Sequence, residues 1–214
     1  DVLAKAQSEL LEYPGAGASI MEVSHRGKVY GAVHQQAVDN VRQLLDISDD
    51  YAVLFLQGGA SQQFYMLPMN LLQPGVTADY VHSGSWAKKA IAEAKLFGDV
   101  NVAADTSKDS PARMPAANEL KLTDGARYLH LTSNETIAGT QWKTFPHVDA
   151  PLVADMSSDI LSRPVDVSPF GLIYAGAQKN LGPAGVTLVI VRKDFVADAN
   201  ADIPSFLQYK LQIE

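Results

Sequence analysis

Cysteine is absent from this chain of 214 residues, so the sequence excludes a disulfide framework and any metal site built on thiolates. No apolar run reaches the roughly 18 residues that a membrane-spanning helix needs. The five histidines show neither metal-ligand spacing nor a His-Glu-x-x-His motif. We therefore expect no metal site and no membrane partner.

Positive charge is also scarce. The chain has 17 Lys and Arg against 24 Asp and Glu, which gives a formal net charge of −7, and its basic residues are scattered. This balance argues against a nucleic acid or another polyanion as the partner. No signal peptide is visible and the chain starts in a helical pattern, so we expect a soluble cytoplasmic protein.

Apolar residues are plentiful, at 47%, and they come in short runs separated by helical patterns. The length suits one large α/β domain, or one domain plus a fragment. The most polar stretch, residues 107–125, is predicted to be a loop on the protein surface. Alternation of this kind predicts an α/β layer fold with a mainly parallel sheet. The predicted strands are 52–56, 78–82, 100–104, 128–131, 152–154, 172–175 and 186–191, and the predicted helices are 2–13, 32–47, 61–72 and 86–97.

Lys179 is the most informative residue. It follows the apolar run 172–175 and lies in a loop of small residues that includes Gly176 and Gly182. The glycines allow close backbone approach, and an amine in such a pocket suits Schiff-base chemistry. The alternative is a surface lysine in a glycine-rich loop.

Asp155 ends another apolar run, and Gly58 follows a third. In parallel sheets, ligands bind outside the carboxyl ends of the strands, so we expect Gly58, Asp155 and Lys179 to converge on one edge. A buried carboxylate needs a partner, and a protonated pyridine nitrogen is one candidate. A helix cap or a salt bridge is the alternative.

Residues 57–61, Gln-Gly-Gly-Ala-Ser, lie between a predicted strand and a predicted helix. Free backbone amides at a helix start favour a phosphate, and Ser61 adds a hydroxyl. The alternative is a tight turn with a serine cap. Gln178 could donate a further hydrogen bond to a phosphate.

Other candidate residues are less specific. Trp86 could stack on a planar cofactor, or could simply pack in the core. The hydroxyl of Thr136 could serve a phenolic oxygen, or a turn. His25 and Arg26 could bind a carboxylate or phosphate, although an exposed polar loop explains them equally well. Together the amine, carboxylate, phosphate cup, ring stacker and hydroxyl match the needs of pyridoxal phosphate.

At these residues the sequence resembles the phosphoserine aminotransferases, a family of fold-type I enzymes that use pyridoxal 5'-phosphate. The similarity runs along essentially the whole chain and is most specific in residues 24–27, 57–64, 154–164 and 174–183. The resemblance implies a three-layer α/β fold with a mainly parallel central sheet, the large cofactor-binding domain of such an enzyme.

The resemblance also implies roles for single residues. Lys179 would be the Schiff-base lysine and Asp155 the partner of the ring nitrogen, and these two residues would be catalytic. Some family members carry Gly-Arg where Ala60 and Ser61 stand here, so phosphate binding would rest on backbone amides and a hydroxyl. The other implied contacts are Trp86 on the ring, Thr136 at the phenolic oxygen, Ala60, Ser61 and Gln178 at the phosphate, and His25 and Arg26 at an acidic group of the substrate.

By the same resemblance, residues 1–214 are an incomplete large domain, without the family's N-terminal segment and C-terminal small domain. The implied reaction transfers an amino group between glutamate and 3-phosphohydroxypyruvate, giving 3-phosphoserine and 2-oxoglutarate in serine biosynthesis, in a homodimer with a shared active site. Two alternatives remain open: another fold-type I aminotransferase, such as the alanine–glyoxylate type, or a non-catalytic domain that binds a phosphate ligand. A cysteine desulfurase would need a mobile cysteine, which this chain lacks.

Overall fold

The computed structural model describes residues 1–213, which divide into two compact units, 1–44 and 45–213. The first unit holds helix α1 (Val2–Leu11) and most of helix α2 (Lys28–Leu45). Asp1 caps α1, because its side chain accepts a hydrogen bond from the backbone N–H of Ala4. Both helices were predicted, although α2 begins four residues earlier than the sequence pattern indicates.

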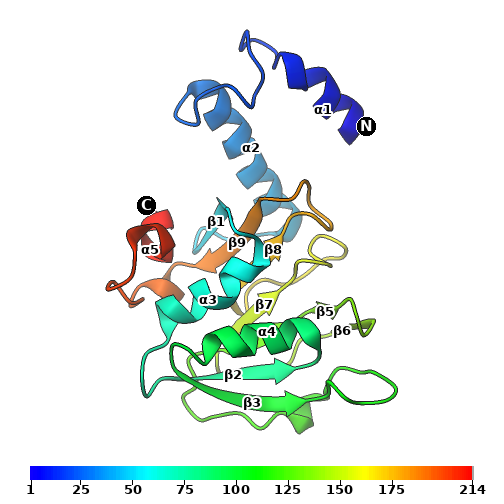
Figure 1. Ribbon diagram of the computed structural model, residues 1–214, viewed down its shortest axis with the longest axis vertical. Helices are drawn as coiled ribbons and strands as arrows, with labels where there is room; N and C mark the ends of the chain where they lie inside the picture. The colour runs from blue at the N-terminus through cyan, green and yellow to red at the C-terminus, as the bar shows by residue number, and fades with distance from the viewer. Residues whose placement is uncertain (214) are drawn as a thin grey trace. The chain divides into compact units, whose positions relative to one another are not determined.

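The second unit is built on a seven-stranded sheet (Figure 1). Its strand order is β1-β9-β8-β7-β4-β2-β3. Strands β8, β7, β4, β2 and β3 pair in parallel, whereas β9 is antiparallel to both β8 and β1. Only β9 therefore runs against the others in this sheet, and the predicted α/β fold with a mainly parallel sheet is confirmed. The strands are β1 (Tyr51–Leu56), β2 (Thr77–His82), β3 (Asp99–Asp105), β4 (Leu129–Thr132), β7 (Leu152–Asp155), β8 (Phe170–Gly176) and β9 (Thr187–Arg192).

Helices α3 (Gly59–Leu71) and α4 (Ser85–Ala94) pack against each other and against the sheet (Figure 1). The core between them and the sheet includes buried tyrosines whose hydroxyls are paired. Tyr80 and Tyr128 share a hydrogen bond of 2.8 Å, and Tyr209, in helix α5 (Tyr209–Ile213), donates to Gln63 Oε1. Buried polar groups must find such partners, so the bond between Tyr209 and Gln63 helps to set the packing of α5 on α3.

Local sequence patterns located most of these elements. Each predicted strand overlaps an observed one, and α3 continues through Pro68 to Leu71. The stretch 107–125 contains one short 3₁₀ helix (Ala117–Glu119) and is otherwise irregular. The sequence did not predict the small hairpin of β5 (Asn134–Glu135) and β6 (Thr140–Gln141), nor the reversed direction of β9.

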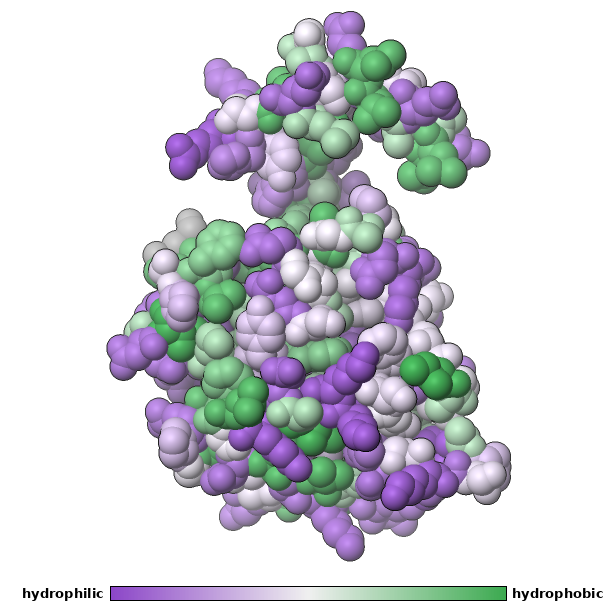
Figure 2. Space-filling model, in the orientation of Figure 1, coloured by the Kyte–Doolittle hydropathy of each residue, from purple (hydrophilic) through white to green (hydrophobic). Residues whose placement is uncertain are grey.

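Polar and apolar side chains interleave over the second unit on the face drawn in Figure 2. Apolar side chains gather beside α5, where Leu211 is exposed, as is Phe206 before the helix. Among the described residues, none of the helices combines the length and the apolar character that crossing a bilayer requires.

Candidate active site

The carboxyl ends of β1, β7 and β8 lie at one edge of the sheet, and the loops that follow them surround a cavity of about 170 Å³. The predicted convergence of these strand ends is therefore confirmed. The cavity is lined by Gly59, Ala60, Ser61, Phe64, Trp86, Thr132, Asn134, Asp155, Ser157, Ser158, Gln178 and Lys179.

Asp155 ends β7 and is 6% exposed. Its Oδ1 accepts hydrogen bonds from the backbone N–H of Ser157 (3.0 Å) and from Ser157 Oγ (2.6 Å), so the carboxylate caps the turn that follows it. Burial raises the pKa of Asp155, and the charge of Glu135 adds to the rise, whereas the bonds from Ser157 and the charge of Lys179 oppose it. A cation in the cavity would relieve the cost of ionising this group.

Lys179 follows β8 in the loop predicted from the sequence, and its side chain is exposed. Its Nζ lies 5.1 Å from the centroid of the Trp86 ring. At the end of β8, the backbone N–H of Gly176 donates to Ser157 Oγ (3.0 Å). Ser157 therefore connects the strand that precedes the amine to the carboxylate on the neighbouring strand.

Trp86 is the second residue of α4 and is half-buried. Its side chain packs against the core and also lines the cavity. The predicted core packing is therefore observed, and the position is also compatible with a ring stacker. The indole Nε1–H donates to Thr136 Oγ1 (3.1 Å). Thr136 itself lies outside the cavity lining, beside Trp86.

The start of α3 is the place where the sequence predicts an anion-binding cup. Gly58 is the N-cap residue, with φ of 93°, and no side chain caps the helix there. Ser61 lies inside the helix, so the alternative of a serine cap is not observed. Glycine is favoured at position 58 because its φ of 93° lies in the left-handed region and a Cβ there would lie 2.6 Å from Gln62 Cβ. The first N–H groups of α3 are thus available to a negative charge.

His25 and Arg26 belong to the first unit, in the turn before α2. Ser24 orders that turn, because its Oγ accepts from the backbone N–H of Arg26 (3.2 Å) and its carbonyl oxygen accepts from the N–H of Gly27 (2.8 Å). Their role at a substrate stays a prediction.

Several residues of the site were missed by the sequence reasoning. Glu135 is fully buried beside Trp86, and Ser157 holds Asp155. A weak signal was present for both, since Glu135 precedes Thr136 and Ser157 lies two residues after Asp155. Phe64, Thr132, Asn134 and Ser158 also line the cavity, without a comparable signal.

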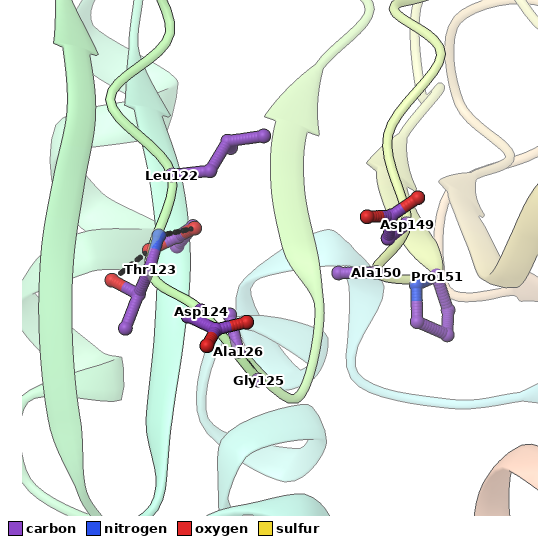
Figure 3. A pocket seen from close by; sticks show the side chains of 9 residues that line it. Leu122, Thr123, Asp124, Gly125, Ala126, Asp149, Ala150 and Pro151 are labelled. Carbon is purple, nitrogen blue, oxygen red and sulfur yellow. Dashed lines mark hydrogen bonds between the residues drawn. The ribbon is translucent and has the colours of Figure 1, made fainter.

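A larger cavity, of about 500 Å³, lies near the amino ends of β2, β4 and β7 (Figure 3). Its buried carboxylate, Asp79, has partners on both oxygens: it accepts from the N–H and Oγ of Thr123 and from Asn101 Nδ2, each at 2.8 Å. Asp124 and Asp149 also line this cavity. The residues that line it include no lysine, arginine or histidine, so the smaller cavity, which has an amine beside a carboxylate, is the better candidate for an active site.

Comparison with known proteins gives a consistent picture. Residues 1–202 match the family model described as Aminotransferase class-V. The chain is 55% identical over 215 residues to a phosphoserine aminotransferase of Niallia circulans, and 52% identical over 214 residues to one of Bacillus subtilis. Each match covers 100% of this chain and 59% of the relative, so the chain spans about three fifths of the length of these relatives.

Solved structures agree. A phosphoserine aminotransferase studied for radiation damage of its Schiff base superposes with a TM-score of 0.94 at 53% identity, covering 99% of this chain and 59% of that one. A phosphoserine aminotransferase of Trichomonas vaginalis with bound PLP superposes with a TM-score of 0.92 at 38% identity, covering 99% and 60%.

Proposed function

Because the chain belongs to the aminotransferase class-V family, we propose that it binds pyridoxal 5'-phosphate in the cavity between β1, β7 and β8. We propose further that the intact protein is a phosphoserine aminotransferase, which exchanges an amino group between glutamate and 3-phosphohydroxypyruvate. The curated relatives carry that name at 52–55% identity.

The observation that carries the proposal is one cavity with three kinds of group. A buried carboxylate (Asp155), a primary amine (Lys179) and the uncapped start of α3 all line it. The carboxylate suits a protonated ring nitrogen, the amine suits a carbonyl, and the helix start suits a phosphate. These residues therefore fit the cofactor.

Lys179, Asp155 and Trp86 would each have a different task in transamination. Pyridoxal phosphate supplies a carbonyl that condenses with amines and a ring that accepts electrons. Lys179 would anchor the cofactor covalently, and its free amine would take the proton from the substrate α-carbon and later return it. Asp155 would keep a proton on the ring nitrogen, and Trp86 would pack against the ring.

The start of α3 would bind the phosphate. The backbone N–H groups of Gly59, Ala60 and Ser61, the hydroxyl of Ser61 and the amide of Gln178 are the proposed donors. Thr136 is proposed to meet the phenolic oxygen while it accepts from Trp86.

Substrate recognition is assigned to His25 and Arg26, since a guanidinium binds a phosphate or carboxylate through two parallel hydrogen bonds. A homodimer with a shared site, a cytoplasmic location and an incomplete large domain in residues 1–214 are also part of the proposal. Resemblance to the family supports these points.

The test is to reduce full-length protein with borohydride in the presence of the cofactor and to map the labelled peptide. We expect the label on Lys179. The Lys179→Ala variant should lose both the label and transamination activity, whereas Lys108→Ala should keep both. A label on Lys193 or Lys210 would contradict the assignment. A protein that binds the cofactor without label or a visible absorption band would instead be a non-catalytic phosphate-ligand domain.

A further inference from the structure

The start of α4 lacks a cap of its own. Its N-cap residue is Gly84, which has no side chain to accept from the free N–H groups of the first turn. Glu135, from β5, supplies the missing acceptors across space. Its Oε1 accepts from the N–H of Ala87 (3.0 Å) and its Oε2 from the N–H of Trp86 (3.4 Å). A carboxylate at this position also complements the positive end of the helix.

Gly84 and Glu135 are fitted to one another. A Cβ on Gly84 would lie 2.7 Å from Cδ and from Oε2 of Glu135, closer than a real Cβ approaches another heavy atom. Glu135 is 0% exposed, so its carboxylate has little room to move away. The absence of a side chain at position 84 therefore leaves space for the carboxylate that caps the helix.

The residue after Glu135 completes the arrangement. Thr136 accepts from the indole N–H of Trp86, while Glu135 accepts from the backbone N–H of the same tryptophan. Two adjacent residues of one hairpin thus contact Trp86 at both its backbone and its ring. Neither contact reaches the cavity, which Trp86 lines directly.

We propose that Glu135 is a positioning residue, which fixes the first turn of α4 so that the Trp86 ring lies against the cofactor site. The inference rests on the proposed function only in naming what the ring faces. The position of Trp86 itself is a property of the cofactor-free protein and can be measured there.

The experiment uses full-length protein carrying Trp142→Phe, with any tryptophan outside residues 1–214 also replaced by phenylalanine, so that Trp86 is the one fluorescent indole. Glu135→Gln and Glu135→Ala are compared with Glu93→Gln, which removes a carboxylate from the same helix away from its start. Acrylamide quenching of Trp86 fluorescence and hydrogen exchange of the Trp86 and Ala87 amides are measured without cofactor. Affinity for pyridoxal phosphate is measured separately by titration.

Both Glu135 variants should increase quenching of Trp86 and speed exchange of the two amides under conditions where the protein remains folded. The glutamine variant keeps the volume but offers one acceptor oxygen instead of two. Cofactor affinity should fall by roughly three- to tenfold, within the range that a lost N-cap contact allows. Glu93→Gln should change none of these quantities.

Gly84→Ala gives an independent check. It should mimic loss of Glu135 in the parent, yet have little further effect in the Glu135→Ala background, because the clashing carboxylate is then gone. Unchanged quenching and exchange in the folded Glu135 variants, or equal effects of Gly84→Ala in both backgrounds, would overturn the inference. Failure of the parent to bind pyridoxal phosphate would instead count against the proposed function.

Discussion

Replacing Asp155 by asparagine should make the cofactor-free protein more stable and the cofactor weaker. The substitution keeps the shape of the side chain, and an amide oxygen at the Oδ1 position can still accept from the N–H and Oγ of Ser157. It removes the ability to carry a negative charge and places an NH2 donor where Oδ2 was. The variant therefore separates the charge of Asp155 from its structural hydrogen bonds.

The sign of the stability effect follows from the raised pKa of Asp155. An acid whose pKa is higher in the folded than in the unfolded chain binds more protons when folded. The native state therefore loses stability as pH rises from the unfolded value, near 3.8, through the raised folded value. Asparagine cannot ionise, so the variant does not lose this stability as pH rises. The variant should be the more stable protein at neutral pH, and its advantage should disappear below about pH 4.

The effect on binding has the opposite direction. A hydrogen bond to a charged group contributes about 1.5–3 kcal/mol, so losing the ionic partner of the ring nitrogen should weaken cofactor affinity by roughly 10- to 150-fold. Transfer of the substrate α-proton should slow by a larger factor, since the ring would also lose its protonated nitrogen.

Urea denaturation of full-length, cofactor-free protein between pH 3.5 and 8 measures the first effect, and titration with pyridoxal phosphate measures the second. A variant less stable than the parent at neutral pH would refute the argument that burial of this charge is costly. Unchanged cofactor affinity would refute the pairing of Asp155 with the ring nitrogen.

Three further substitutions test other parts of the structure. Arg26→Ala should weaken binding of phosphoserine by roughly tenfold or more through loss of a charge-assisted pair, and unchanged binding of both phosphoserine and glutamate would remove Arg26 from the substrate site. Tyr209→Phe should cost about 1–3 kcal/mol of unfolding free energy, seen as a lower melting temperature, because buried Gln63 Oε1 loses its donor; an unchanged melting temperature would mean that this bond adds no net stability. Gly58→Ala should reduce both stability and cofactor affinity, because alanine is strained at φ of 93° and its Cβ would clash with Gln62; full affinity for pyridoxal phosphate would count against the phosphate cup.

Local sequence patterns were sufficient for much of this protein. Short apolar runs and helical periodicity predicted the α/β class, because the two periods differ and each is encoded by neighbouring residues. The same runs placed Gly58, Asp155 and Lys179 at strand ends, and parallel pairing brings such ends to one edge of a sheet. Residue type then indicated the chemistry, since an amine, a carboxylate and a helix start serve different parts of one cofactor.

Tertiary structure decided what depends on contacts between distant segments. The reversed direction of β9 follows from its pairing with β1 and β8, which no local pattern encodes. The capping of α4 by Glu135 joins segments about 50 residues apart, and the clash that excludes a side chain at Gly84 exists only once they meet. The raised pKa of Asp155 likewise arises from burial, and burial is a property of the packed fold rather than of the residues beside it in the chain.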